Sequence, residues 1–164
     1  MSMQGDRDAP RWLSEGEQAA WRAYLRATRA LEVVLDKDLQ DRGIGFSEYE
    51  LISMLSESPG GRMRMSALAD LIVQSRSRVT HTASRLEGRG WVTREQCVDD
   101  RRGVELVLTD SGRREVEEMA RVHVGSVRAH FIDLLSDVQI QEMGEAMTKV
   151  YHSATGTPMD DPIH

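Results

Sequence analysis

The chain has 164 residues, with 27 acidic and 21 basic side chains, histidine excluded, and a net charge of −6. This length suits one ordinary domain, or a small lobe joined to a helical platform, and excludes a second, catalytic domain. No apolar run approaches the roughly 20 residues that cross a bilayer, and the amino terminus has no signal-sequence pattern, so we expect a cytoplasmic protein. The single cysteine, Cys97, excludes an internal disulfide.

The amino-terminal segment predicts one long helix. Ser14 and Glu17 have the spacing of a capping box, in which each side chain accepts the backbone N–H of the other residue. Apolar residues three and four apart run from Trp21 to Leu39, and Gly43 supplies a stop signal. A helix of this length and pattern needs a packing partner.

A shorter helix is predicted next. Ser47 and Glu50 have the spacing of a second capping box, and apolar residues continue to Leu55. The segment 58–61, with the sequence Ser-Pro-Gly-Gly, ends this helix.

Two short helix patterns follow, separated by a turn. The first opens at Ser66 and indicates a supporting helix. The second opens at Ser75, and its buried stripe consists of Val79, Ala83 and Leu86. Polar and basic side chains lie off that stripe, where they suit contact with a DNA groove. The predicted DNA contacts on this helix are Ser75, Arg76, Ser77, Arg78, Thr80, His81 and Arg85.

A half-buried β-hairpin is predicted after these helices. Residues 91–98 and 104–108 alternate between the two faces of a strand, and the charged segment 99–103 connects them. Arginines at the tip can reach phosphate or the minor groove while an aspartate holds one of them in place. The predicted DNA contacts here are Arg94, Asp99, Arg101 and Arg102. An ordinary solvated hairpin with surface ion pairs is the alternative. Cys97 is expected to be a small buried residue, with a redox switch as the alternative.

The charge distribution favours nucleic acid as the partner. Residues 62–102 contain nine arginines, no lysine and five acidic residues, which leaves this segment at +4 and the remainder at −10. The planar fork of arginine binds phosphate or the edge of guanine in a bidentate way. A solvated run of charge is the alternative, but these arginines coincide with the two helix patterns and the hairpin.

Two further helices are predicted after the hairpin. Thr109 can cap a helix that reaches about Leu135, and Ser136 and Gln139 form another capping box. The last helix has a narrow apolar stripe that suits a dimer interface, with plain monomer core as the alternative. This stripe consists of Ile140, Met143, Met147 and Val150.

Two histidines, His123 and His130, lie seven residues apart on one face of the penultimate helix. This spacing of two turns exceeds that of a direct chelating pair, so we expect packed or solvated histidines and predict no metal site. A partner chain's carboxylate completing a metal site is the alternative. The sequence has no phosphate loop, nucleophile elbow or metal motif, so we predict no cofactor and no enzymatic activity.

These motifs together resemble the MarR family of bacterial transcriptional regulators over roughly residues 14–152. The resemblance rests on Ser66–Leu71, Ser75–Gly90, Asp99–Arg102 and Leu108–Gly112. It implies a homodimer of winged helix-turn-helix lobes, a pseudopalindromic operator in double-stranded DNA, autorepression, and release of DNA when a small molecule binds. It also implies a ligand site in the cleft between the platform and the lobe.

The expected fold is mainly α with a small β-hairpin wing. We assign residues 12–46 and 110–153 to a helical dimerisation region and residues 47–109 to the DNA-binding lobe. Residues 1–11 and 154–164 are expected to be disordered tails.

Aromatic side chains at the start of the first helix are candidates for binding an effector. They offer aromatic walls and one cation, which suit an aromatic anion, and packing in a dimer interface is the alternative. The candidate residues are Trp12, Trp21, Arg22 and Tyr24.

The function predicted from the sequence is sequence-specific binding of double-stranded DNA by a homodimeric repressor. Two recognition helices would enter successive major grooves roughly 34 to 36 Å apart. Their side chains would divide between bases and phosphates, while the hairpin arginines would supply sequence-independent affinity. A winged-helix module that binds protein is the alternative function.

Overall fold

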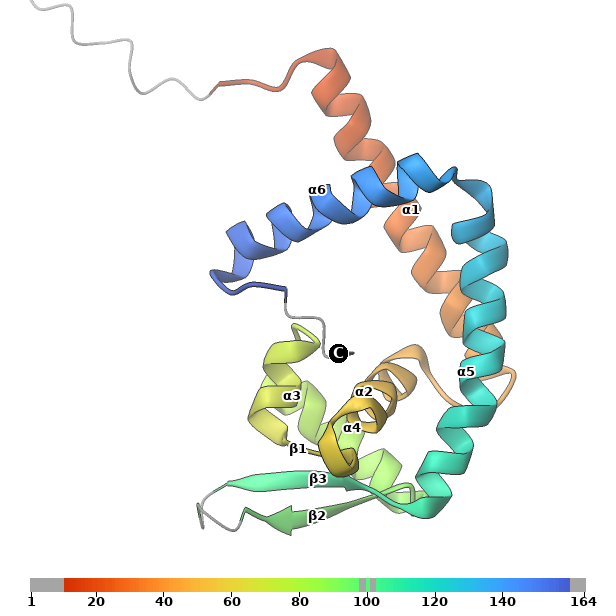
Figure 1. Ribbon diagram of the computed structural model, residues 1–164, viewed down its shortest axis with the longest axis vertical. Helices are drawn as coiled ribbons and strands as arrows, with labels where there is room; N and C mark the ends of the chain where they lie inside the picture. The colour runs from red at the N-terminus through yellow and green to blue at the C-terminus, as the bar shows by residue number, and fades with distance from the viewer. Residues whose placement is uncertain (1–10, 98–99, 101–102, 160–164) are drawn as a thin grey trace, which may run out of the picture.

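The computed structural model describes residues 11–97, 100 and 103–159. The described elements, in chain order, are α1 (Glu15–Gln40), α2 (Phe46–Glu57), η1 (Pro59–Gly61), β1 (Arg62–Arg64), α3 (Met65–Leu71), α4 (Arg76–Gly88), β2 (Val92–Gln96), β3 (Val104–Leu108), α5 (Asp110–His130), η2 (Ile132–Leu134) and α6 (Asp137–Thr155). The fold is therefore mainly helical with one small sheet, which confirms the fold class that the sequence predicts (Figure 1).

The elements form two parts, which we call the lobe and the platform. The lobe runs from α2 to β3, and the platform consists of α1, α5 and α6 (Figure 1). The buried apolar cluster lies between Leu39 and Met119, so it comprises the lobe, the end of α1 and the first half of α5. The lobe thus has its own core, and the two long helices that flank it position it relative to the rest of the platform.

The sheet has three antiparallel strands in the order β1-β3-β2. Arg62 of β1 lies opposite Val107, and Val92 of β2 lies opposite Leu108. The sequence predicts only β2 and β3, because β1 has three residues and is too short to show alternation. β2 is also shorter than the predicted strand over residues 91–98.

Four predicted helix starts are confirmed. In each, a hydroxyl oxygen accepts a backbone N–H from the first turn, which satisfies one of the helix's unpaired donors. The capping residues are Ser14 of α1, Ser75 of α4, Thr109 of α5 and Ser136 of α6.

The predicted start of the second helix is wrong. α2 begins at Phe46, with Gly45 at the N-cap, and Glu48 accepts the Gly45 N–H at 2.9 Å. Glu50 is therefore no capping residue, and its carboxylate accepts a hydrogen bond from Gln74 at 2.9 Å instead. A tertiary contact between α2 and the turn after α3 thus replaces the local contact that the spacing suggests.

Three further boundaries differ from the sequence prediction. α3 begins at Met65, without a side-chain cap, so Ser66 lies inside the helix. α5 ends at His130 because Phe131 has non-helical dihedral angles, and η2 follows. α6 continues to Thr155, two residues into the predicted tail, and stops where Gly156 adopts a φ of 71°. The rest of the predicted tails, residues 1–10 and 160–164, lies outside the described residues.

The platform leaves much apolar surface uncovered. No residue of α6 is buried over Asp137–Thr155. Near the start of α1, Trp12 is 84% exposed and Trp21 is 52% exposed. Within the described part of the chain, no helix has both the length and the apolar character needed to span a membrane.

Candidate DNA-binding surface

The helix α4 presents one polar face to solvent. Its buried side chains are Val79, Thr82, Ala83 and Leu86, which lie on the stripe that the sequence predicts, with Thr82 in addition. All seven predicted DNA contacts on this helix, Ser75, Arg76, Ser77, Arg78, Thr80, His81 and Arg85, are exposed. Packing of the apolar stripe on the lobe core therefore brings these polar side chains together on the outer face.

These seven side chains differ in what they contact. Arg76 and His81 have no side-chain hydrogen bond or ion pair with another described residue. Arg78 donates to the hydroxyl of Ser47 at 3.3 Å, a weak contact that DNA can replace. Arg76 and His81 are thus the side chains most available to a ligand.

Arg85 is held by a carboxylate of the neighbouring helix α2. Its Nε lies 3.2 Å from Oε1 of Glu48, whose side chain is buried. Glu48 also accepts the Gly45 N–H, so one carboxylate joins the start of α2 to α4. No sequence pattern marks Glu48 as a partner of Arg85, although its place three residues after Gly45 is the position of a capping glutamate.

Arg94 of β2 extends toward α4. Its Nη2 donates to the carbonyl oxygen of Thr80 at 3.0 Å and to Oγ of Ser84 at 2.7 Å. Its Nη1 lies 3.6 Å from the carboxylate of Glu87, and the side chain is 29% exposed. This predicted DNA contact therefore has three partners on α4.

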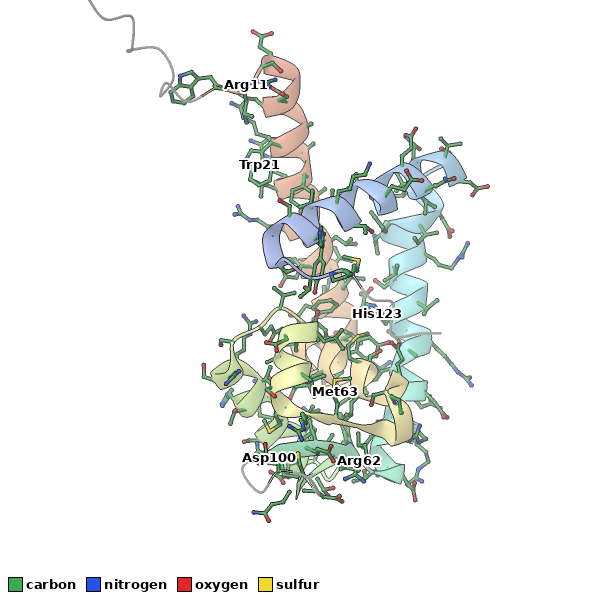
Figure 2. The ribbon with its side chains drawn as sticks, turned by 60° about the vertical axis from the view of Figure 1, so that its left-hand side comes forward. Arg11, Trp21, Arg62, Met63, Asp100 and His123 are labelled. Atoms are coloured by element: carbon green, nitrogen blue, oxygen red, sulfur yellow. The ribbon has the colours of Figure 1, made fainter. Side chains whose placement is uncertain are left out.

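The base of the wing is held by ion pairs across the sheet. Arg62 lies 2.8 Å from the carboxylate of Glu95 and 2.9 Å from that of Glu105, and these hydrogen bonds raise the pKa of Arg62. Arg64 lies 3.6 Å from Asp100. Figure 2 shows Arg62 and Asp100 at the sheet end of the molecule. These two arginines of the basic segment are thus engaged with acidic residues of the lobe.

The tip of the wing is only partly described. Asp99, Arg101 and Arg102 lie outside the described residues, so their contacts with DNA remain predictions. At the tip's base, Cys97 is buried, and its N–H donates to the carbonyl of Gly103 at 3.0 Å. Burial makes the thiol part of the wing's packing.

His123 of α5 lies where the platform meets the lobe (Figure 2). Its ring centroid is 4.7 Å from that of Tyr49 and 5.9 Å from that of Phe46, both on α2. Burial lowers the pKa of His123, and its buried Nδ1 has no hydrogen-bond partner among the described residues. His130 is exposed. Within the described part of the chain, no three His, Cys, Asp or Glu side chains gather as a metal site would require.

The candidate effector residues lie together at the start of α1. Trp12, Trp21 and Arg22 line a shallow cavity of about 270 Å³ with Leu13 and Gln18. The fourth candidate, Tyr24, stacks on Trp21 with a centroid distance of 5.8 Å. Figure 2 shows Trp21 far from the lobe, so within one chain this cavity does not face the junction between platform and lobe.

A second cavity does lie between the lobe and the platform. It has a volume of about 450 Å³, and it is open between the end of α3 and the carboxyl end of α6. The residues that line it are Ala69, Asp70, Val73, Gln74, Tyr151, Thr155 and Thr157.

Comparison with known proteins shows that the chain is similar in sequence and structure to members of one family. A sequence model of the MarR family matches residues 46–104. The chain is 44% identical to AbsC, a MarR family transcriptional regulator from Streptomyces coelicolor, with a TM-score of 0.85, over 90% of this chain and 100% of that chain. It is 42% identical to Sco3205, a MarR family transcriptional regulator of the same organism solved in complex with DNA, with a TM-score of 0.85, over 89% of this chain and 92% of that chain.

A curated relative agrees with this assignment. The transcriptional repressor MprA of Escherichia coli K12 is 30% identical over 84 residues, which are 51% of this chain and 48% of MprA. The fold and the exposed face of α4 thus define a DNA-binding transcriptional regulator with a winged helix-turn-helix. The chain belongs to the MarR family.

Proposed function

We propose that this regulator is a homodimeric repressor that reads a pseudopalindromic operator with the exposed face of α4. The observation that carries the proposal is the set of exposed polar and basic side chains on α4, which packing on the lobe core leaves free of the interior. An exposed helix of this kind fits the major groove of B-DNA. Sco3205, which is 42% identical and was solved with DNA, supports the same use of the fold.

The proposed dimer would bury the apolar surface of the platform. The stripe of α6 is half-buried at Ile140, Met143 and Met147, while Val150 is 56% exposed. A helix with a one-sided apolar stripe and no buried residue is typical of an interface that a second helix covers. This supports the assignment of residues 12–46 and 110–153 to dimerisation and of residues 47–109 to DNA binding.

The proposed contacts divide between bases and backbone. Arg76 and His81 are exposed and have no side-chain partner among the described residues, so they can reach base edges or phosphate without breaking an internal contact. Arg101 and Arg102 would contact phosphate or the minor groove beside the helix, with Asp99 orienting one of them. The two copies of α4 would lie roughly 34 to 36 Å apart, which sets the spacing of the half-sites at one helical turn.

The experiment that tests this function is a binding selection. Duplexes that bind the wild-type protein are enriched from the DNA upstream of its own gene and from a random-sequence pool. Affinity for an enriched duplex and for a shuffled duplex is then measured over a salt series, because phosphate contacts make affinity depend on salt. Enrichment of a pseudopalindrome, bound far more tightly than the shuffled duplex, supports the function. Equal binding of both duplexes overturns it in favour of a protein-interaction module.

A pair of arginine variants sharpens this experiment. Arg76→Ala removes an exposed charge of α4, and we expect the slope of log affinity against log salt to fall by about 0.9 if the residue contacts phosphate. If it contacts a base, the preference for the enriched duplex falls instead. The matched control is Arg121→Ala, which removes an exposed arginine of α5 outside the lobe and leaves both quantities unchanged.

We further propose an aromatic anion as the effector, bound in the cavity at the start of α1. Trp12 and Trp21 offer apolar walls there, and Arg22 offers a cation whose Nη2 already donates to Gln18 at 2.9 Å. Because this cavity is remote from the lobe within one chain, its effect on DNA binding would pass through the second protomer.

Titration with salicylate, an aromatic carboxylate, tests the effector. Quenching of tryptophan fluorescence that Arg22→Gln abolishes, together with release of the enriched duplex, supports it. Quenching unchanged in Arg22→Gln, or no quenching, leaves the aromatic residues as packing of the dimer interface and overturns the effector proposal.

A further inference from the structure

Arg94 crosses from the wing to the recognition helix and contacts one turn of it. The Nη2 atom donates to the carbonyl oxygen of Thr80 at 3.0 Å and to Oγ of Ser84 at 2.7 Å. Ser84 Oγ also donates to the same carbonyl at 3.0 Å. Three hydrogen bonds thus join Nη2 of Arg94, the Ser84 hydroxyl and the Thr80 carbonyl to one another. They connect β2 to the middle of α4.

A third contact restricts the guanidinium further. Nη1 of Arg94 lies 3.6 Å from the carboxylate of Glu87, one turn further along α4. The side chain is 29% exposed, and its Nε is buried without a hydrogen-bond partner among the described residues. To reach a phosphate, Arg94 would have to give up hydrogen bonds that a charged donor makes strongly.

The turn that Arg94 contacts also carries side chains proposed to touch DNA. Thr80 and His81 lie on that turn and are exposed. On a different element, Glu48 of α2 holds Arg85 of the same helix. The helix α4 is therefore contacted from α2 by one ion pair and from the wing by Arg94.

We propose that Arg94 is a positioning residue that sets the orientation of α4 relative to the wing and so determines sequence preference without contacting DNA. The proposal rests on the function proposed above, since it concerns how the same surface reads an operator. It differs from the sequence prediction, which makes Arg94 a DNA contact. A phosphate contact and a positioning contact leave different signatures, because only the phosphate contact releases counterions.

The test compares two duplexes, the one enriched by the wild-type protein and its shuffled counterpart, over a salt series. We expect Arg94→Ala to lower the ratio of the two affinities about tenfold, the size of one lost charge-assisted hydrogen bond, and to leave the salt slope unchanged. Ser84→Ala should lower the same ratio less. The double variant should resemble Arg94→Ala alone, because both substitutions remove one shared contact.

Arg94→Lys separates positioning from charge. Lysine keeps the positive charge and can still bind a phosphate, but it lacks the planar fork that reaches Thr80 and Ser84 together. We therefore expect Arg94→Lys not to restore the affinity ratio. Partial unfolding lowers the affinity for both duplexes by the same factor, so the ratio is insensitive to a purely structural loss. If Arg94→Ala does not fold, Arg94→Lys and Ser84→Ala supply the same test.

Three results overturn the inference. A salt slope that falls by about 0.9 in Arg94→Ala, with the ratio retained and the slope restored by Arg94→Lys, would make Arg94 a phosphate contact. A wild-type protein that binds both duplexes equally would refute the proposed function itself, and the inference with it. A wild-type protein that discriminates, with a ratio unchanged in all four variants, would refute the inference alone.

Discussion

Glu48 of α2 and Arg85 of α4 form an ion pair with 3.2 Å between Oε1 and Nε, in which the carboxylate is buried and the guanidinium is half exposed. The pair joins α2 and α4, whose first residues, Phe46 and Arg76, are 30 positions apart in the sequence, so it belongs to the tertiary structure alone. Because Glu48 also accepts the Gly45 N–H, it serves as the cap of α2 and as a link to the recognition helix.

Removing this carboxylate should destabilise the lobe. We expect Glu48→Ala to lower the free energy of unfolding by about 1 to 3 kcal/mol, because the Gly45 N–H loses its acceptor and Arg85 loses its partner. Urea denaturation measures the change. Glu57→Ala, which removes an exposed carboxylate at the other end of α2, should stay within about 0.5 kcal/mol of wild type. Equal midpoints for the two variants would contradict the role of Glu48.

Gly112 should not tolerate a side chain. A Cβ at this position would lie 2.1 Å from the carbonyl oxygen of Trp91 and 2.8 Å from Cδ1 of Leu108. We expect Gly112→Ala to cost about 3 kcal/mol, because the start of α5 must move away from the residue that precedes β2. The matched control is Gly88→Ala in α4, where nothing lies within 4 Å and alanine should stabilise the helix by up to about 1 kcal/mol. Thermal unfolding followed by circular dichroism checks both, and a neutral Gly112→Ala would refute the close contact.

Acid should weaken the folded state through His123. Burial lowers the pKa of His123 below its ordinary value of 6.5, so below that value the unfolded chain binds the proton more readily than the folded chain. This contribution to the free energy of unfolding is present above pH 6.5 and is lost as the pH falls to the folded pKa. Urea denaturation at several pH values in this range gives the free energy of unfolding at each pH. The slope of that free energy against pH should be smaller in His123→Gln than in the wild type.

The control for this pH dependence is His130→Gln, which changes an exposed histidine of the same helix. In this variant the slope of the free energy of unfolding against pH should equal that of the wild type. Burial raises the pKa of Glu50, which has the opposite effect at lower pH because the folded state then binds the proton first. Taking the difference between each variant and the wild type removes this contribution. Identical slopes in all three proteins would show that His123 titrates as it does in the unfolded chain.

A charge on the apolar stripe of α6 should separate the proposed dimer. We expect Met147→Asp to convert the protein to monomers and to lower its affinity for the enriched duplex, because an aspartate buried between protomers would lack a partner. Lys149→Asp places the same carboxylate on the exposed opposite face of α6 and should leave the dimer intact. Light scattering after size-exclusion chromatography gives the mass. A wild-type monomer, or a dimeric Met147→Asp, would refute α6 as the interface.

Much of the fold could be predicted because its signals are local. The caps at Ser14, Ser75, Thr109 and Ser136 each depend on residues within the same helical turn, and the stripe of α4 repeats within one helix. Such patterns follow from the geometry of a single helix and need no knowledge of the rest of the chain. The exposure of the predicted contacts on α4 follows from the same stripe.

The tertiary structure decided which of the lobe's arginines have partners within the lobe. By sequence, Arg76, Arg85 and Arg94 all belong to one basic segment and are all predicted DNA contacts. In the folded chain, Arg85 meets Glu48 and Arg94 meets Thr80 and Ser84, while Arg76 keeps no such partner among the described residues. Contacts between distant segments have no spacing that a sequence pattern can reveal. The sequence therefore determined the helices, the hairpin and the family, whereas packing of α2 and β2 against α4 decided which of these arginines have partners inside the lobe.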